Sequence, residues 1–434
     1  MTENGLRADS VPALLRDRST GTGVALRVKR LGLWEKISWA EYAARVNALA
    51  REMIHLGLEA GERVAVLCEN RPEWLIADIA IQTARGATVG VYTTSSPEQL
   101  AYHVNHSDSV GLFLEDAEQL EKWLAVRDQC PTVRWVVVVE PEDVEGTLEW
   151  EAVLQSGAER YAADPAPVEE RLAAIEPSDT ALFIYTSGTT GNPKGAMLSH
   201  ANLLWAIDSL NAATPLRADD ELLSFLPLSH IVERLISVTA PLRFGYTVSF
   251  TENLDTVLTN LQEIRPTVFF AVPRIWEKLY SMVELHMKDA NVVKRVAYSA
   301  AMGAARGHNR LATGLAHLAV LRLLRYRLGL DRVRVAISGA APIAPEVLGY
   351  FRLIGVDVRE GYGLTESTGI ISIHRGGGRL GTVGYPFKGV EVKIADDGEV
   401  LVKGIDVFDG YWNKPEETAA VFTGDWFHTG DIGS

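Results

Sequence analysis

The chain has 434 residues, of which 47% are hydrophobic and 23% are charged, so it can bury a sizeable core in one large lobe built from several subdomains. Its formal net charge of -14 argues against a nucleic-acid-binding protein, which needs a basic surface, but is compatible with a local phosphate site. Only two cysteines (Cys68 and Cys130), no signal-peptide pattern and no long apolar run predict a cytoplasmic protein without a disulfide framework or a membrane span.

The first part of the chain alternates helix-like and strand-like segments. Residues 37–57 are predicted to form a helix, with Ser38 as its N-cap, Glu41 completing a capping box and Gly57 as its stop. A second helix is expected over 72–85. Short buried strands are expected over 63–68, 87–92, 110–115 and 133–139. This alternation predicts a mainly parallel sheet covered by helices.

A stretch rich in Pro, Ala and acidic residues, 161–179, is interpreted as a connector. Beyond it, the strand 181–186 runs into a loop rich in Gly and Thr, and a second series of strands and helices follows. After residue 380 the chain changes to short strands punctuated by glycine, and Asp397-Gly398 indicates a hairpin. The chain is therefore expected to end in a small β-rich subdomain.

Residues 291–330 are basic although the chain is acidic overall. They contain no Asp or Glu and seven cations: Lys294, Arg295, Arg306, Arg310, Arg322, Arg325 and Arg327. One interpretation is an amphipathic surface in peripheral contact with anionic lipid. A pair of solvated helices explains the same composition, and we prefer it because charge runs alone are weak motifs.

The strongest chemical signal is the string YTSGTTGNPKG at 185–195, between an apolar strand and a helix expected to begin near Ser199. Glycines let a backbone turn tightly and approach a ligand, and successive N–H groups in such a loop form an anion-binding nest. Hydroxyl and cationic side chains add donors for a triphosphate. The residues concerned are Thr186, Ser187, Gly188, Thr189, Thr190, Gly191, Lys194 and Gly195. The loop is not a Walker motif, because its lysine precedes the last glycine.

This string resembles the phosphate loop of the adenylate-forming superfamily, which comprises acyl-CoA synthetases, luciferases and peptide-synthetase adenylation domains. Further segments resemble the other motifs of the family, in the family order: SGAAP at 338–342, EGYGLTES at 360–367, the segment 398–418 and FHTGDIG at 427–433. The first 180 residues match the family only in general texture. The resemblance therefore depends on motifs between 185 and 433.

The resemblance implies a role for each motif residue. By this resemblance, Tyr362 stacks on adenine, flanked by Gly361 and Gly363 and beside Gly339, Ala340 and Glu360. Asp431 is expected to bind the ribose, and Thr365 to contact the α-phosphate. Glu366 and Thr186 are expected to hold Mg²⁺. Lys194, His230, Thr365 and Glu366 are the expected catalytic residues. In the reaction of the family, a carboxylate attacks the α-phosphorus of ATP to give acyl-AMP, and CoA then takes the acyl group. No protein nucleophile is needed.

The acid substrate is expected to be a long-chain fatty acid. The segments 224–234 (SFLPLSHIVER) and 265–280 (RPTVFFAVPRIWEKLY) resemble the long-chain fatty acyl-CoA synthetase branch, in which His230 matches a position at the acyl entrance. Trp276 and Arg274 either gate the tunnel or pack, and packing is the preferred interpretation. Ala340 stands where long-chain members often have glycine, and we expect its methyl group to affect the chain-length preference.

The expected fold is α/β, with two α/β subdomains of mainly parallel sheets plus a distorted β-barrel. The predicted divisions are 1–175, 176–335 with the phosphate loop and acyl segments, and 336–434 with the nucleotide motifs and barrel. The chain reaches Ser434 without the family's lid domain, so on its own it is expected to bind ATP and fatty acid but to adenylate poorly.

Three alternatives to the ligase stay open. The acceptor of the acyl group is either CoA or, as in fatty acyl-AMP ligases, a carrier protein. A non-catalytic module that binds ATP or acyl-adenylate is the second alternative, and a P-loop NTPase is a distant third because its lysine would be misplaced. The oligomeric state and the acyl chain length do not follow from the sequence.

Overall fold

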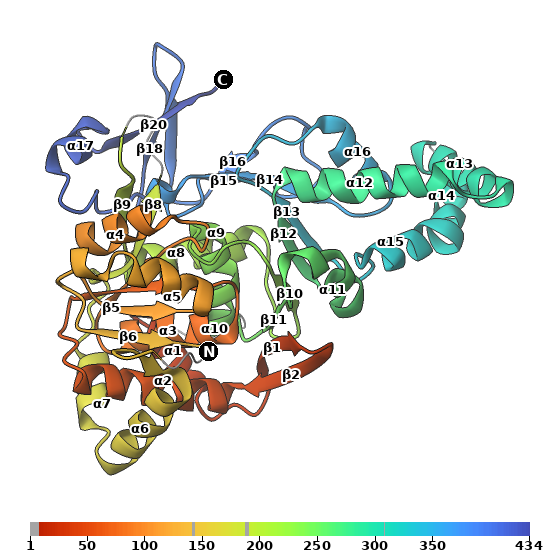
Figure 1. Cartoon of the computed structure of the whole chain (residues 1–434). Coiled ribbons are helices and arrows are strands. Elements are labelled where there is room, and N and C mark those ends of the chain that lie inside the picture. Colours follow the sequence, from red (N-terminus) through yellow and green to blue (C-terminus); the bar gives the residue numbers. More distant parts are fainter. Residues whose placement is uncertain (1–7, 141–143, 187–190, 308) are drawn as a thin grey trace.

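The computed structural model describes residues 8–140, 144–186, 191–307 and 309–434. The chain folds around two large, mainly parallel sheets with helices packed against them, and a small antiparallel sheet lies near the C-terminus (Figure 1). The predicted mixed α/β class with mainly parallel sheets is confirmed. No helix within these described ranges is long and apolar enough to span a bilayer.

The first large sheet has seven strands, parallel except for the edge strand β9. In spatial order they are β7 (Leu148–Glu149), β6 (Trp135–Val138), β5 (Ser109–Leu114), β3 (Arg63–Leu67), β4 (Ala87–Gly90), β8 (Thr180–Thr186) and β9 (Lys194–Ser199). The helices of this part are α2 (Trp39–His55), α3 (Pro72–Thr83), α4 (Pro97–His106), α5 (Ala117–Leu124), α6 (Trp150–Ala163) and α7 (Ala166–Ala173), with a 3₁₀ turn at Arg127–Gln129. The predicted strands between 63 and 139 all occur.

Two sequence predictions in this region have opposite outcomes. The capping box of α2 is confirmed: the Ser38 side chain accepts from the Glu41 N–H, and the Glu41 carboxylate accepts from the Ser38 N–H. The connector predicted over 161–179 is wrong, because α6 extends to Ala163 and α7 fills half of the remainder. Val168 and Leu172 of α7 are buried, so their helical spacing stabilises a short helix despite the nearby prolines.

The second large sheet has nine strands and is parallel from β14 to β1. In spatial order they are β16 (Tyr385–Pro386), β15 (Ser372–Ile373), β14 (Val358–Tyr362), β13 (Val335–Ser338), β12 (Val268–Ala271), β10 (Glu221–Ser224), β11 (Thr247–Phe250), β1 (Val24–Arg30) and β2 (Leu33–Ser38). Its helices include α1 (Val11–Arg18), α8 (His200–Ala213), α9 (Ile231–Arg234), a π-helical turn (Leu235–Thr239), α10 (Ala240–Phe244), α11 (Val257–Ile264), α12 (Pro273–Lys288) and α16 (Pro345–Leu353), with 3₁₀ turns at Leu254–Thr256 and Thr365–Ser367.

Sheet membership does not follow the predicted boundary at 175/176. The strands β1 and β2 precede that boundary but belong to the nine-stranded sheet, whereas β8 and β9 follow it and complete the seven-stranded sheet. Long-range strand pairing of this kind leaves no local signal in the sequence. The two predicted α/β sheets are present. The division of the chain into three domains at the predicted boundaries stays a prediction.

The small sheet consists of β17 (Glu391–Ile394), β18 (Glu399–Lys403), β20 (Trp426–Ile432) and β19 (Phe422–Thr423), beside α17 (Pro415–Ala420). The predicted hairpin at Asp397-Gly398 joins β17 to β18, and Gly398 has the positive φ of +90° that its turn requires. Among the described residues this sheet is open, so the distorted barrel stays a prediction.

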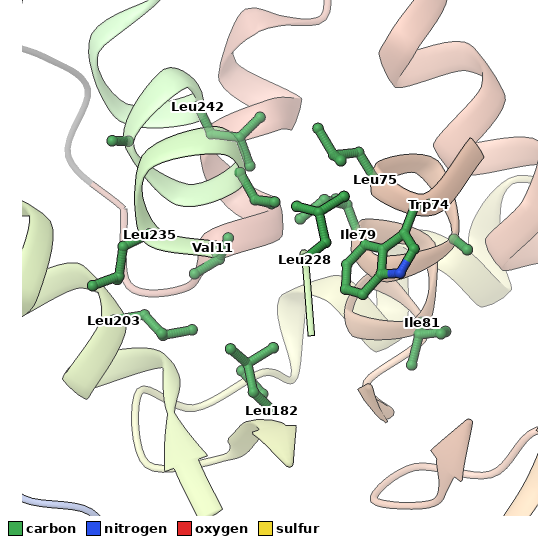
Figure 2. Close-up of a cluster of buried hydrophobic side chains, with 14 of the residues drawn as sticks. Val11, Trp74, Leu75, Ile79, Ile81, Leu182, Leu203, Leu228, Leu235 and Leu242 are labelled. Atoms are coloured by element: carbon green, nitrogen blue, oxygen red, sulfur yellow. The ribbon is translucent and has the colours of Figure 1, made fainter. Parts of the chain in front are cut away.

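A buried apolar cluster fixes the segment that carries His230. Leu228 lies beside Trp74 and Ile79 of α3, and Leu235, on the other side of His230 in the sequence, lies near Val11 and Leu203 in the same cluster (Figure 2). Leu228, Leu235 and Trp74 are each about 1% exposed. Fully burying one such side chain contributes roughly 1.5–3 kcal/mol. The core of the molecule therefore holds the predicted acyl-entrance segment against α3.

Trp276 packs and does not gate. It is fully buried, and its ring centroid lies 5.1 Å from that of Phe269 and 4.9 Å from that of Phe351, both in edge-to-face geometry. Such aromatic pairs stabilise a core beyond the area that they bury. Both partners belong to the apolar cluster beneath β12 and α16. The preferred packing interpretation is confirmed for Trp276.

Candidate functional site

One cavity of about 270 Å³ lies where strands from both large sheets end. Parallel sheets bind ligands beyond the carboxyl ends of their strands, and the cavity adjoins those ends of β8, β12, β13 and β14. Predicted site residues that line it are Thr186, His230, Gly339, Ala340, Gly361, Tyr362, Gly363, Thr365 and Glu366. The fold therefore gathers residues spread over 180 positions of the sequence around one space.

The polar end of the cavity is organised around Glu366. Its Oε1 accepts a hydrogen bond from Tyr411 Oη at 2.7 Å and a longer one from Thr186 Oγ1 at 3.4 Å. Burial, and next the neighbouring Glu366 carboxylate, raise the pKa of Tyr411, which keeps its phenol protonated as a donor. The predicted metal residues Thr186 and Glu366 are thus brought together, with Tyr411 as a third member that the motif comparison left without a role.

The phosphate loop joins two antiparallel strands. Thr186 at the end of β8 lies opposite Lys194 at the start of β9, and the Lys194 ammonium lies 5.0 Å from the Tyr411 ring centroid. Ser199 caps α8, as expected, but β9 separates the loop from that helix. Gly191 has a φ of +127°, a conformation that favours glycine. Lys194 therefore belongs to the cluster around Glu366 although it does not line the cavity.

Four predicted phosphate-binding residues lie outside the described residues. They are Ser187, Gly188, Thr189 and Thr190. Their roles stay predictions.

Tyr362 and Asp431, predicted to hold adenine and ribose, are in direct contact. Tyr362 Oη donates to Asp431 Oδ2 at 2.7 Å, across 69 positions of sequence. Burial, and next this hydrogen bond, raise the pKa of Tyr362. A side chain at Gly363 would place its Cβ 2.4 Å from the Gly369 carbonyl oxygen, so this position requires glycine for close packing. Glu360 is the exception in this motif: it is buried, its pKa is raised by burial, and it does not line the cavity.

His230 lines the cavity at the start of α9. Its Nδ1 accepts a hydrogen bond from the Val232 N–H at 3.3 Å, so Nε2 carries the proton of the neutral ring. Burial lowers the pKa of His230, which favours that neutral form at pH 7. The ring that lines the cavity is therefore an uncharged hydrogen-bond donor.

Two buried polar networks hold the segment after His230. Glu233 accepts from Ser224 Oγ and Ser237 Oγ, each at 2.6 Å, and burial raises its pKa to about 7. Arg234 donates to Asp78 of α3 at 2.5 Å, and both side chains are at most 1% exposed. The adjoining π-helical turn is a rare geometry that is frequent at functional sites. This segment is therefore tied to both large sheets.

Much of the cavity wall is apolar. Its apolar side chains include Leu210, Ile231, Leu235, Ile236, Phe270 and Phe387. Apolar walls with a few polar groups suit a ligand that has a hydrocarbon part and a polar head. Only Ile231 and Phe270 lie in the segments that the sequence comparison assigned to the acyl pocket, because the other residues come from elements without a recognisable motif.

The oxygen ligands at the polar end fit Mg²⁺. Mg²⁺ usually binds through one or two carboxylates and substrate phosphates while keeping several waters. Glu366 and the Thr186 hydroxyl supply such hard oxygen atoms. Within the part of the chain that the structure describes, there is no group of three or more His, Cys, Asp or Glu side chains placed to hold a metal by themselves. A metal here would therefore depend on nucleotide oxygens for the rest of its coordination.

Tyr411→Phe is expected to raise the Mg²⁺ concentration needed for half-maximal activity about tenfold. The variant keeps the ring beside Lys194 but removes the hydroxyl that orients Glu366, and outer partners of metal ligands are typically worth 10–100-fold in metal affinity or activity. A Mg²⁺ titration at fixed ATP measures the effect. Tyr385→Phe, at an exposed position, is the matched control and should leave the titration unchanged. Equal Mg²⁺ requirements for the two variants would contradict the role of Tyr411.

Comparison with known proteins agrees with this geometry. A family model described as AMP-binding enzyme matches residues 17–412. The chain is 36% identical over 416 residues to the long-chain-fatty-acid–CoA ligase FadD15 of Mycobacterium tuberculosis, covering 93% of this chain and 68% of that protein. It is 32% identical over 440 residues to the long-chain-fatty-acid–CoA ligase ACSBG2 of Xenopus laevis, covering 95% and 59%.

Solved structures show the same fold at lower sequence identity. The anthranilate CoA ligase AuaEII, crystallised with anthranoyl-AMP, matches with a TM-score of 0.78 at 21% identity, over 97% of this chain and 75% of that chain. The N-terminal domain of FACL13 from Mycobacterium tuberculosis matches with a TM-score of 0.72 at 22% identity, over 98% and 97%. The chain thus spans nearly the whole of that domain, but 68% or less of the two curated relatives described above.

Proposed function

Because the chain belongs to the AMP-binding enzyme family, we propose that it activates a long-chain fatty acid with ATP and transfers the acyl group to CoA. One observation carries this proposal: a single cavity is lined both by apolar side chains, including Leu235 and Phe270, and by the polar motif residues Thr365, Glu366 and Tyr362. A fatty acyl-adenylate combines the same two characters, a hydrocarbon chain and a nucleotide.

In the first half-reaction the fatty acid carboxylate attacks the α-phosphorus of ATP. A bond forms between the carboxylate oxygen and phosphorus, the bond to the bridging oxygen breaks, and pyrophosphate leaves. Thr365 and the neutral His230 are the proposed hydrogen-bond donors to the oxygens of the reacting groups, and Lys194 offsets the phosphate charge. Bound through Glu366 and the phosphates, Mg²⁺ would supply further charge neutralisation. Positioning and preorganised charge are enough for this chemistry.

In the second half-reaction the CoA sulfur attacks the acyl carbon, and AMP leaves with the electron pair of the broken C–O bond. The contact between Tyr362 and Asp431 supports an adenosine site that persists through both halves. The apolar wall around Leu235 excludes water from the activated acyl group, which otherwise hydrolyses. The protein's residues thus bind, orient and shield, and none forms a covalent intermediate.

The products identify the reaction. The protein expressed from its whole reading frame is incubated with ATP, Mg²⁺, CoA and acids from short to long, and the products are measured by mass spectrometry. Long-chain acyl-CoA with AMP supports the proposal. Acyl-AMP without a thioester would indicate a carrier-protein acceptor, and neither product would favour a module that binds adenylate without catalysis.

Ala340→Gly is expected to change both stability and acid preference. Ala340 lines the cavity with a φ of +71°, where an L-residue with a Cβ is strained by roughly 1–2 kcal/mol. Glycine relieves that strain at an entropic cost of about 0.4–1 kcal/mol, so the free energy of unfolding should rise by about 0.5–1 kcal/mol. Loss of the methyl group should shift the ratio of kcat/KM between long and medium acids by up to roughly tenfold.

Denaturant unfolding and competition between acids of different length measure the two effects. Ala344→Gly is the matched control, because Ala344 has an ordinary φ of -61° and offers no strain to relieve. That control should change stability little, because the entropic cost of glycine is offset by its preference over alanine at the N-cap of α16, and it should keep the acid preference. An unchanged preference in Ala340→Gly would exclude the methyl group as a determinant of chain length.

A further inference from the structure

A helical arm extends from the nine-stranded sheet between β12 and β13. It comprises α12, α13 (Val292–Arg306), α14 (Arg310–Ala316), a π-helical turn (His317–Leu321) and α15 (Arg322–Leu328), and it reaches away from the body of the molecule (Figure 1). Its inner side is packed: Ala301, Met302, Ala316, Leu321 and Leu328 are buried in one core cluster with Trp276. The arm is therefore a built part of the fold and not a loose insertion.

The outer side of the arm exposes aliphatic side chains. Leu311, Leu315 and Leu318, which are 81%, 67% and 67% exposed, recur at the spacing of one helix face. Val292, Val293 and Val296 at the start of α13 are also more than 60% exposed. Nine of the eighteen exposed large hydrophobic side chains among the described residues fall between 285 and 326. Single exposed apolar residues are ordinary, but such a concentration marks a contact surface.

The same arm concentrates positive charge. Residues 273–330 contain ten Lys or Arg and three Asp or Glu, a net +7 in a chain whose net charge is -14. The three acids, Glu277, Glu284 and Asp289, all precede 291. The seven cations of 291–330 form no ion pair with any part of the chain that the structure describes, and only Arg325 is anchored, to the Ile354 carbonyl oxygen at 2.7 Å. The arm therefore combines exposed aliphatic groups with cations that make no ion pair in the described part of the chain.

We propose that the arm docks this chain on the surface of an anionic lipid bilayer. Aliphatic side chains of α13 and α14 enter the boundary between headgroups and acyl chains, while the surrounding Lys and Arg contact lipid phosphates. A protein partner fits less well, because protein interfaces are enriched in aromatic anchors whereas this surface is aliphatic with one exposed aromatic side chain, Tyr326. Docking rests on this surface chemistry alone; only its purpose, access to a membrane-dissolved acid, rests on the proposed function.

The proposal takes up the lipid-contact interpretation of 291–330 in place of two solvated helices. Composition alone favoured solvation, since cations on an exposed helix need no explanation. A solvated helix does not need a row of exposed leucines at helical spacing, which this arm has.

Vesicle co-sedimentation without ATP, acid or CoA tests the proposal. Wild type should bind vesicles of phosphatidylcholine with phosphatidylglycerol much more tightly than vesicles of phosphatidylcholine alone, and added salt should weaken binding. The triple variant Leu311→Ser, Leu315→Ser, Leu318→Ser should bind at least about tenfold more weakly. The double variant Lys294→Glu, Arg295→Glu should bind more than about 20-fold more weakly. Removing each cation should weaken vesicle binding roughly fivefold, and replacing it by an anion should weaken binding further.

Matched changes elsewhere on the surface serve as controls. The triple variant Leu33→Ser, Leu254→Ser, Ile394→Ser removes exposed aliphatic groups outside the arm, and the double variant Lys36→Glu, Lys388→Glu reverses two exposed cations there. Both should bind vesicles like wild type, and thermal unfolding verifies that all four variants fold.

Three results would overturn the proposal: equal binding to neutral and anionic vesicles, equal binding by arm and control variants, or a change in molecular mass by light scattering in the arm variants with vesicle binding unchanged. The last would assign the surface to a second copy of the chain. Because no substrate is present, these outcomes are independent of whether the protein is a ligase.

Discussion

Glu366→Gln is expected to lower the rate of acyl-adenylate formation about 10²–10³-fold, the scale on which a single preorganised electrostatic contact acts in a transition state. Glutamine keeps the shape of the side chain and an oxygen that can accept from Tyr411 Oη, now 2.7 Å from Glu366 Oε1. It removes the negative charge that a divalent cation needs. The loss should therefore arise from charge and not from a collapsed site.

The two half-reactions separate this effect from general damage. Pyrophosphate exchange reports adenylation, and preformed acyl-AMP supplied with CoA reports thioester formation. We expect the variant to lose the first and largely to keep the second, since the phosphoryl chemistry is finished once the adenylate exists. Glu391→Gln, an exposed glutamate on β17, is the control. Retention of more than about a tenth of the exchange activity would exclude Glu366 as the metal-binding carboxylate.

The candidate site was predictable wherever its residues fall in short contiguous strings. Tyr362, Thr365 and Glu366 lie within eight positions of each other, and the turn chemistry and donor types of that string already indicate a nucleotide. Asp431 was predictable only through its place in FHTGDIG, yet the structure brings it to 2.7 Å from the Tyr362 hydroxyl. Local strings thus supply candidate ligands, and the fold decides which of them meet.

The residues that support these ligands were not predictable. Tyr411 contacts Glu366 across 45 positions, and Asp78 contacts Arg234 across 156, so no spacing rule connects either pair. A similar limit applies to the fold: the alternation of helices and strands gave the parallel class, but not that β1 and β2 join the nine-stranded sheet. Pairing between distant strands depends on how the whole chain packs, and short windows of sequence do not contain that information.

The buried pair of Asp78 and Arg234 is where such a non-local contact matters most for stability. The guanidinium donates to Asp78 Oδ1 and lies 4.4 Å from the Trp74 ring centroid, while Gln82 and Thr88 donate to the same carboxylate oxygen. Burial raises the pKa of the Asp78 carboxyl and lowers the pKa of Arg234, although each faces the opposite charge. Desolvation is thus the larger effect, so each member of the pair depends on its partner to remain charged.

Arg234→Met is therefore expected to lower the free energy of unfolding by about 3–5 kcal/mol at pH 8, since it leaves the Asp78 carboxylate buried without its counter-charge. Methionine retains an unbranched apolar chain against Trp74, so little of the loss should come from a cavity. Chemical denaturation of wild type, Arg234→Met and the double variant Asp78→Asn, Arg234→Met measures it. The double variant should recover at least half of the loss, because a neutral amide needs no counter-charge.

The pH dependence of Arg234→Met distinguishes an unpaired charge from lost packing. Without Arg234, the folded-state pKa of Asp78 rises further above its unfolded value of about 3.9. The stability that this group contributes is fully present below the unfolded pKa and is lost as pH rises through the folded pKa. The variant should consequently be less destabilised at pH 5 than at pH 8. A destabilisation of equal size at pH 5 and pH 8 would instead indicate simple loss of packing.

Arg234 follows His230 by one helical turn, so in Arg234→Met the kcat/KM for the acid should also fall more than the affinity for ATP does. Equal losses of the two would indicate a general disturbance of the site.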